Sequence, residues 1–140
     1  LARIAQLCEE NGISEHVELC GARDNATVRD ALKHADAAVL PCVVAADGER
    51  DGIPIFFIEA MALGVPVITT PISGIPELIR DGDTGFLHAT SDVQALTDRI
   101  AAVLGDPELA KAVGDRGREE VHKTLDVNES ATQLIAHIER

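Results

Sequence analysis

Two short apolar runs limit the folds open to this chain more than any other feature. They are AAVLPC, residues 37–42, and VPVITT, residues 65–70. Neither run alternates apolar with polar residues, so each is typical of a strand that is buried on both faces of a sheet. The apolar segment 54–63 lies between them, ends at Gly64 and predicts a helix. Strand, helix and strand in this order indicate a parallel sheet with crossover helices.

The other elements continue this alternation. We expect two further strands over 17–20 and 85–88, and helices over 2–11, 27–34, 76–80, 91–104, 107–124 and 128–138. Ser91 with Gln94 three residues later forms a capping-box pattern at the start of one of these helices. The predicted fold class is α/β, a Rossmann-like doubly wound parallel sheet with C-terminal helices. About four strands are fewer than such a sheet usually has, so we expect the first strand or two upstream of Leu1.

Composition excludes several classes of function. The chain has 140 residues, 46% of them hydrophobic, and a net charge of -12. This length and hydrophobicity suit one domain with its own core. The acidic charge argues against nucleic acid and against an anionic membrane surface, since both are bound mainly through Lys and Arg. The sequence shows no transmembrane segment.

The cysteines and histidines show no metal-binding pattern. Cys8, Cys20 and Cys42 are odd in number and far apart, so neither a disulfide framework nor a metal site is expected. A reducing compartment fits this cysteine usage, and we expect a cytoplasmic protein. The five histidines have no ligand spacing, and we predict no metal.

The residues that carry chemistry are expected after the strand 37–42, because ligands of open α/β sheets bind beyond the carboxyl ends of the strands. Asp51 precedes the predicted helix, and Gly52 permits a close backbone approach there. The start of a helix offers free N–H groups and a positive dipole end, which suit a phosphate. Glu59 follows eight residues after Asp51, in the most apolar helix of the chain. A carboxylate there needs compensation, either from hydrogen bonds within the core or from hydroxyls of a bound sugar.

One continuous block carries a family resemblance. The segment DGIPIFFIEAMALGVPVITTPISGIPELIRDGDTGFL, residues 51–87, resembles the signature region of retaining, nucleotide-sugar-dependent glycosyltransferases of the GT-B fold, specifically family 4. The hallmark of that family is Glu-x7-Glu followed by A-M-A-x-G-x-P-V-I. Here the first acid is Asp51, one methylene shorter, and the second is Glu59. By this resemblance, residues 1–140 are the truncated C-terminal, nucleotide-sugar-binding domain of such an enzyme.

The resemblance also implies roles for individual residues. Glu59 would bind the ribose hydroxyls of a nucleotide diphosphate sugar, and Asp51 would face the donor sugar as the catalytic position. The backbone of three further residues, Gly52, Ile53 and Ile55, would meet the sugar and the diphosphate. The turn Gly21-Ala22-Arg23 would lie beside the base. No metal or other cofactor is implied, and the nucleotide diphosphate sugar is the donor substrate.

Other parts of the enzyme are expected outside these residues. The resemblance implies that two cations which neutralise the leaving diphosphate, and the site for a sugar or lipid-linked acceptor, come from upstream. We therefore expect the chain alone to be catalytically silent, and any contact with the inner membrane to be made through the missing N-terminal domain. Two alternatives stay open: a nucleotide-sugar epimerase or sugar synthase of the same fold, and a non-catalytic module that binds a nucleotide or a partner.

Overall fold

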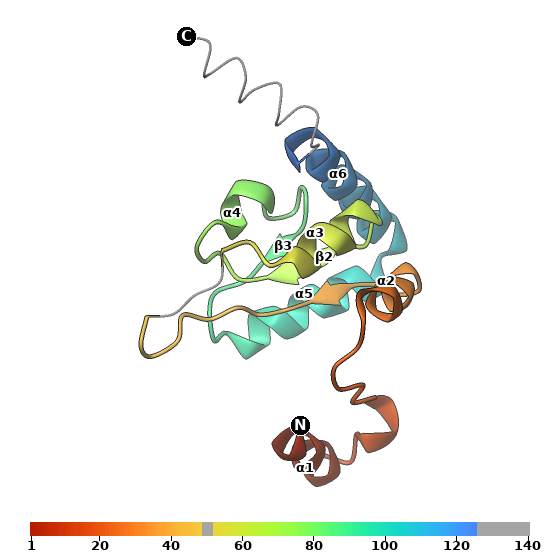
Figure 1. Cartoon of the computed structure of the whole chain (residues 1–140), viewed down its shortest axis with the longest axis vertical. Coiled ribbons are helices and arrows are strands. Elements are labelled where there is room, and N and C mark those ends of the chain that lie inside the picture. Colours follow the sequence, from red (N-terminus) through yellow and green to blue (C-terminus); the bar gives the residue numbers. More distant parts are fainter. Residues whose placement is uncertain (49–51, 126–140) are drawn as a thin grey trace. The chain divides into compact units, whose positions relative to one another are not determined.

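The computed structural model describes residues 1–48 and 52–125, and contacts divide the chain into two units (Figure 1). The first unit is Leu1–Asp30 and the second is Ala31–Arg140. Ten elements are described: α1 (Ala2–Glu10), η1 (Ser14–His16), α2 (Asn25–Lys33), β1 (Ala38–Val39), α3 (Ile55–Ala62), β2 (Val67–Thr69), α4 (Ile75–Leu78), β3 (Phe86–Leu87), α5 (Val93–Gly105) and α6 (Pro107–Leu125). The helix expected over 128–138 lies outside the described residues.

The first unit is short and mostly exposed. Helix α1 buries Cys8 and ends at Glu10 with Asn11 as its C-cap, close to the predicted range 2–11. Helix α2 starts at Asn25, two residues before the predicted start. The reason is a cap: the Asp24 Oδ1 accepts a hydrogen bond of 2.8 Å from the Thr27 N–H. This bond lowers the pKa of Asp24 below its ordinary value and satisfies one of the free donors at the helix start.

The strand predicted over 17–20 is wrong. Val17 has extended backbone angles, but residues 17–20 belong to no strand and all four are exposed. An extended segment becomes a strand only when a neighbouring strand satisfies its N–H and C=O groups. No strand is found in the described first unit, so nothing there pairs with this segment. The described sheet therefore has three strands and not the expected four.

The second unit is built on a parallel sheet in the order β1-β2-β3. Ala38 pairs with Val67, and Ile68 pairs with Phe86. All three residues of β2 are buried, which confirms that its unbroken apolar pattern belongs to a strand covered on both faces. The strands are shorter than the runs that predicted them, because backbone pairing stops after two or three residues.

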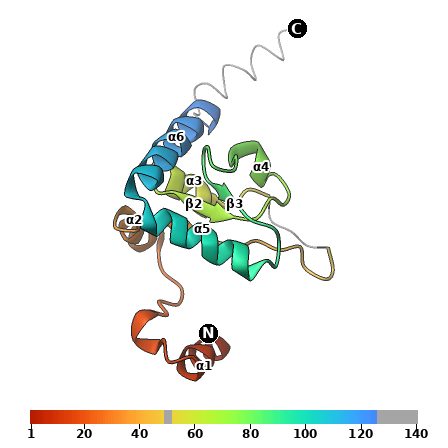
Figure 2. The same ribbon diagram turned by 180° about the vertical axis from the view of Figure 1, so that it is seen from behind.

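Helices cover both faces of the sheet. Helix α3 and helix α5 both pack on β2, and the two opposite views show them on opposite faces of it (Figures 1 and 2). Ile68 and Phe86 form a core with Val103 of α5 and Val113 of α6. On the other face, α3 buries Phe57, Ala60 and Met61. Helices on both faces of a parallel sheet confirm the predicted α/β class. Helices α5 and α6 are two of the helices expected at the C-terminal end of the chain.

The helices at the C-terminal end begin where side chains cap them. The capping box predicted at Ser91 is wrong: α5 is capped by Asp92, whose Oδ1 accepts from the Ala95 N–H at 2.9 Å. Ser91 has a φ of +64° and belongs to the preceding turn. Asp106 caps α6, accepting from the Leu109 N–H at 3.0 Å, and the helix begins at Pro107 as predicted. Helix α6 then packs along both α3 and α5.

Candidate functional site

The carboxyl ends of the three parallel strands lie at the same edge of the sheet. Three segments leave from this edge: the β1–α3 loop, the β2–α4 turn over 70–74, and the segment after β3 that begins at His88. Open parallel sheets bind ligands at this edge, because the connecting loops and helix starts converge there. We call these segments together the carboxyl edge.

The first backbone N–H groups of α3 have no hydrogen-bond partner among the described residues. Pro54 is the N-cap residue and provides no side-chain hydrogen bond. The Phe57 N–H bonds to the Pro54 carbonyl at 3.0 Å, which leaves the N–H groups of Ile55 and Phe56 ahead of the first helical bond. Ile55 is 71% exposed, so this first turn is open to solvent. An open helix start without a described side-chain cap is suited to bind an anion such as a phosphate.

Glu59 lies one turn further along the same face of α3. Residues four apart on a helix are neighbours, so Glu59 stands beside the exposed Ile55 and away from the buried Phe57 and Met61. The side chain is half-buried, and no hydrogen bond or ion pair joins it to another described residue. The desolvation cost is therefore smaller than the apolar sequence around it suggests. A half-exposed carboxylate without a described partner remains available to a ligand.

The β1–α3 loop returns to α3 against the β2–α4 turn. Gly52 is exposed, and a Cβ placed on it would meet no atom within 4 Å. Ile53 is half-buried and lies so close to Gly74 that a Cβ on Gly74 would be 3.2 Å from the Ile53 Cγ1. This contact fixes the approach to Pro54 and leaves the Gly52 backbone open to the edge.

Two buried threonines hold the outgoing part of the same loop. The Thr69 Oγ1 donates to the Leu40 carbonyl at 2.9 Å, and the Thr70 Oγ1 donates to the Cys42 carbonyl. Neither threonine has exposed surface. Sequence reasoning missed both of them, although a Thr-Thr pair at the end of an apolar strand is the signal that could have drawn attention to them.

The β2–α4 turn contains a residue in an uncommon backbone conformation. Ser73 has a φ of +52°, in the left-handed region that non-glycine residues rarely adopt. The turn is closed by the Ile72 N–H, which donates to the Thr70 carbonyl at 2.9 Å, and by the Ile75 N–H, which donates to the Ile72 carbonyl at 3.1 Å. Such residues concentrate at functional sites, and this one lies at the carboxyl edge.

The third segment of the edge begins with a buried imidazole. The His88 Nδ1 lies 2.9 Å from the Ala89 carbonyl, so this nitrogen carries the proton that is donated. The Nε2 is buried and has no hydrogen-bond partner among the described residues. Because it has no contact with solvent either, we assign it no ligand.

The sequence-predicted site residues are only partly brought together. Gly52, Ile53, Ile55 and Glu59 all lie around the start of α3 in the second unit. The turn Gly21-Ala22-Arg23 lies in the first unit, so its place beside a base stays a prediction. Asp51 lies outside the described residues, and its contact with a donor sugar also stays a prediction.

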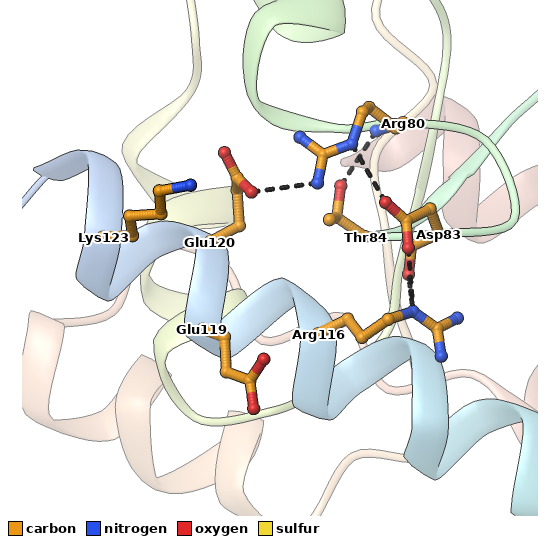
Figure 3. Close-up of a pocket in the computed structure, with 7 residues that line it drawn as sticks. All are labelled: Arg80, Asp83, Thr84, Arg116, Glu119, Glu120 and Lys123. Atoms are coloured by element: carbon orange, nitrogen blue, oxygen red, sulfur yellow. Dashed lines mark hydrogen bonds and ion pairs between the residues drawn. The ribbon is translucent and has the colours of Figure 1, made fainter.

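A charged cavity lies next to the amino end of β3, at the end of the strands away from the carboxyl edge. We call this end the opposite side of the sheet. It has a volume of about 220 Å³, and Figure 3 shows its lining from the turn before β3 and from α6: Arg80, Asp83, Thr84, Arg116, Glu119, Glu120 and Lys123. Arg80 pairs with Asp83 at 3.0 Å and with Glu120 at 2.9 Å, and Arg116 pairs with Asp83 at 2.9 Å. These charges satisfy one another, so the cavity is an ion-pair network and not the better candidate for a ligand site.

Two negative findings concern the same described residues. Within 1–48 and 52–125, no group of three or more His, Cys, Asp or Glu side chains is placed to hold a metal ion. None of the helices over these residues combines the length and hydrophobicity that crossing a bilayer requires.

Comparison with known proteins identifies the class of protein to which this chain belongs. The family model described as Glycosyl transferases group 1 matches residues 1–120. The protein WcaL of Escherichia coli (strain K12), named for glycosyl transfer in colanic acid biosynthesis, is 41% identical over 138 residues. That match covers 95% of this chain and 34% of the relative. N-acetyl-alpha-D-glucosaminyl L-malate synthase of Bacillus anthracis is 36% identical over 120 residues, which cover 86% of this chain and 29% of the relative.

The chain belongs to the glycosyl transferases group 1 family, as the resemblance of residues 51–87 predicts. It spans about a third of the length of these curated relatives. Solved structures agree on the fold. HepE of Anabaena in complex with UDP has a TM-score of 0.85 at 20% identity, covering 99% of this chain and 36% of that one.

Sucrose-phosphate synthase from Thermosynechococcus elongatus has a TM-score of 0.78 at 28% identity, covering 97% of this chain and 34% of that one. These neighbours are GT-B glycosyltransferases. The fold is therefore consistent with the C-terminal half of a GT-B enzyme, and the expected fold class is confirmed.

Proposed function

We propose that this chain is the donor-binding domain of a retaining glycosyltransferase of the family 4 type. The parent enzyme would transfer a sugar from a nucleotide diphosphate sugar to an acceptor hydroxyl in polysaccharide or glycoconjugate synthesis. The observation that carries the proposal is the start of α3, where free N–H groups precede a half-exposed Glu59 on the same helix face.

The chemistry of this site matches a nucleotide diphosphate. The diphosphate would lie at the N–H groups of Ile55 and Phe56, where the helix dipole favours negative charge. Glu59, one turn further, would accept hydrogen bonds from the ribose hydroxyls. Gly52 and Ile53 would present backbone to the sugar, and Asp51 would contact it. Catalysis would rest on the bound geometry and on stabilisation of the leaving diphosphate.

The names of similar proteins support this donor class. HepE has been solved with UDP-glucose, with a TM-score of 0.83 to this chain. A mannosyltransferase of Mycolicibacterium smegmatis, 32% identical over 127 residues, is named as GDP-mannose-dependent. The C-terminal domain of LpcC from Francisella tularensis, a glycosyl transferase group 1 protein solved as a separate domain, has a TM-score of 0.75. It supports the assignment of this chain to a C-terminal domain.

The acceptor, a sugar or lipid-linked hydroxyl, would be bound by residues outside the 140 of this chain. Cytoplasmic localisation, independence of a metal and inactivity of the chain alone are part of the same proposal. They rest on the family resemblance and on the cysteine usage.

The first test is nucleotide binding by the 140-residue chain. We expect UDP or GDP, or one of their sugars, to bind and to shift backbone amide signals of α3 in two-dimensional NMR spectra. Glu59→Ala should weaken this binding at least tenfold, because the ribose hydroxyls lose a charged acceptor. Thermal stability should change little, since the side chain has no described partner in the fold.

Glu119→Ala is the matched control, because Glu119 is an exposed glutamate on α6 at the opposite side of the sheet. It should leave nucleotide affinity unchanged. Equal affinity of the Glu59→Ala variant and the unmodified chain would contradict the ribose assignment. Asp51→Asn should weaken the nucleotide sugar more than the bare diphosphate.

A further inference from the structure

The pairing of β1 with β2 continues beyond the strands by means of side chains. The last backbone bond between them runs from the Leu40 N–H to the Ile68 carbonyl at 3.2 Å. The next two bonds come from hydroxyls: Thr69 to the Leu40 carbonyl at 2.9 Å, and Thr70 to the Cys42 carbonyl. The outgoing chain is therefore held for several residues after the sheet itself has ended.

The two threonines differ in what they hold. The Leu40 carbonyl directly follows the last paired residue of β1, so Thr69 completes the sheet. The Cys42 carbonyl lies two residues further out, inside the β1–α3 loop, and Cys42 itself is buried. Removing the Thr70 hydroxyl would take this hydrogen bond from a buried carbonyl, which is costly, and would release the outgoing chain at that point.

The β2–α4 turn, which contains Thr70, also holds the other end of the β1–α3 loop. Ile53 packs against Gly74 just before α3 begins, while Thr70 bonds to Cys42 just after β1 ends. Thr70 and Gly74 are the first and last residues of the β2–α4 turn. The turn thus fixes both ends of the loop that leads to the free N–H groups of α3.

We propose that Thr70 is a positioning residue for the nucleotide diphosphate site at the start of α3. It touches no ligand; its hydroxyl sets the path of the loop and thereby the position of the backbone that meets the donor. This inference rests on the proposed donor-binding function. It adds a residue that neither the acidic spacing nor the signature block assigns.

A second buried threonine offers a matched control. The Thr84 Oγ1 donates to the Leu78 carbonyl at 2.9 Å and accepts from the Arg80 N–H at 2.9 Å. It is as buried as Thr70 but lies at the amino end of β3, away from the carboxyl edge. Replacing either threonine by valine keeps the shape and removes one buried hydroxyl, so the two changes differ mainly in where they act.

The experiment compares affinity and stability in the unmodified chain and in Thr70→Val, Thr70→Ser and Thr84→Val. Affinity for UDP, GDP and their sugars is measured by NMR titration, and the melting temperature by circular dichroism. We expect Thr70→Val to weaken the nucleotide that binds the unmodified chain at least fivefold. Thr70→Ser, which keeps the hydroxyl, should restore affinity to within twofold, while Thr84→Val should lower the melting temperature and leave affinity unchanged.

The outcomes separate the two proposals. If the unmodified chain binds no nucleotide, the proposed function fails and the role of Thr70 fails with it. If it binds but Thr70→Val binds equally well, or if Thr84→Val weakens binding as much, only the positioning role is overturned. Should Thr70→Val not fold, Thr70→Ala takes its place, and failure of both to fold would show a role in stability alone.

Discussion

The two sides of the sheet in the second unit are held together by different kinds of interaction. At the carboxyl edge, hydroxyl groups and one close Ile53–Gly74 contact fix the loops, and the start of α3 keeps unpaired donors. At the opposite side, ion pairs tie the turn over 80–84 to α6 (Figure 3). Gly117 of α6 also lies so close to this turn that a Cβ on it would be 2.8 Å from the Thr84 carbonyl oxygen. The first arrangement leaves polar groups free for a ligand, whereas the second uses them for stability.

The largest effect should come from breaking the packing of α6. A Cβ on Gly114 would lie 2.1 Å from the Gly64 carbonyl oxygen, so no side chain fits without moving α6 away from the end of α3. We expect Gly114→Ala to destabilise the chain by about 3 kcal/mol or more. Urea denaturation followed by circular dichroism measures the change.

Gly105→Ala is the control for this change. Gly105 is the last residue of α5, and a Cβ there would meet no atom within 4 Å. Its effect should stay within about 1 kcal/mol and favour stability, as alanine is the better helix former. A Gly114→Ala variant as stable as the Gly105→Ala variant would show that α6 is not packed against Gly64 in this way.

A smaller effect should follow from removing one charge of the ion-pair network. The hydrogen bond from Arg80 is the main cause that lowers the pKa of Glu120 below its ordinary value of 4.5, and the same bond raises the pKa of Arg80. Both side chains are partly exposed, so we expect Glu120→Gln to cost up to about 1 kcal/mol at neutral pH. Molar salt should reduce the difference.

The pH dependence gives this prediction its sign. A carboxylate with a lowered pKa in the folded state contributes stability above its unfolded pKa and loses it as the pH falls through the folded pKa. The stability difference between the unmodified chain and Glu120→Gln should therefore be present at pH 7, start to fall near the ordinary pKa of 4.5 and vanish once the pH lies below the lowered pKa of the folded state. Glu119→Gln, which has no ion pair among the described residues, should show no such dependence. A difference that persists in acid would count against the pair.

The contrast between the two sides also explains what the sequence could predict. The strands β1 and β2, the helices within the described residues and the family of the block 51–87 follow from local patterns, and the structure and the family comparison confirm them. The strand over 17–20 was wrong because pairing depends on a neighbour that a local pattern cannot supply. The capping box at Ser91 was wrong because the adjacent Asp92 offers the same chemistry one residue later.

The sequence predicted the chemical groups of the candidate site but not the residues that hold its loop in place. Glu59 and the start of α3 follow from the spacing of acids and from where a helix begins. Thr69 and Thr70 could not be assigned, because their partners lie 29 and 28 residues away and become neighbours only through the crossover between β1 and β2. The burial of Glu59 was overestimated for a similar reason: an apolar helix in sequence still has one face that tertiary packing leaves partly open.

The smallest expected effect concerns the left-handed residue of the carboxyl edge. Ser73→Gly removes the strain of a φ of +52° but adds freedom to the unfolded chain, so we expect a net gain of only about 0.5 kcal/mol. Ser91, with a φ of +64°, is the matched position in the segment after β3, and Ser91→Gly should give a similar gain.

Nucleotide affinity should distinguish these two serines. The Ser73 turn fixes both ends of the β1–α3 loop, so the added freedom of glycine should weaken the nucleotide about twofold, while Ser91→Gly should not. Melting curves and NMR titrations of the two variants measure both quantities. Equal affinities for the two variants would mean that the turn needs no rigidity for binding.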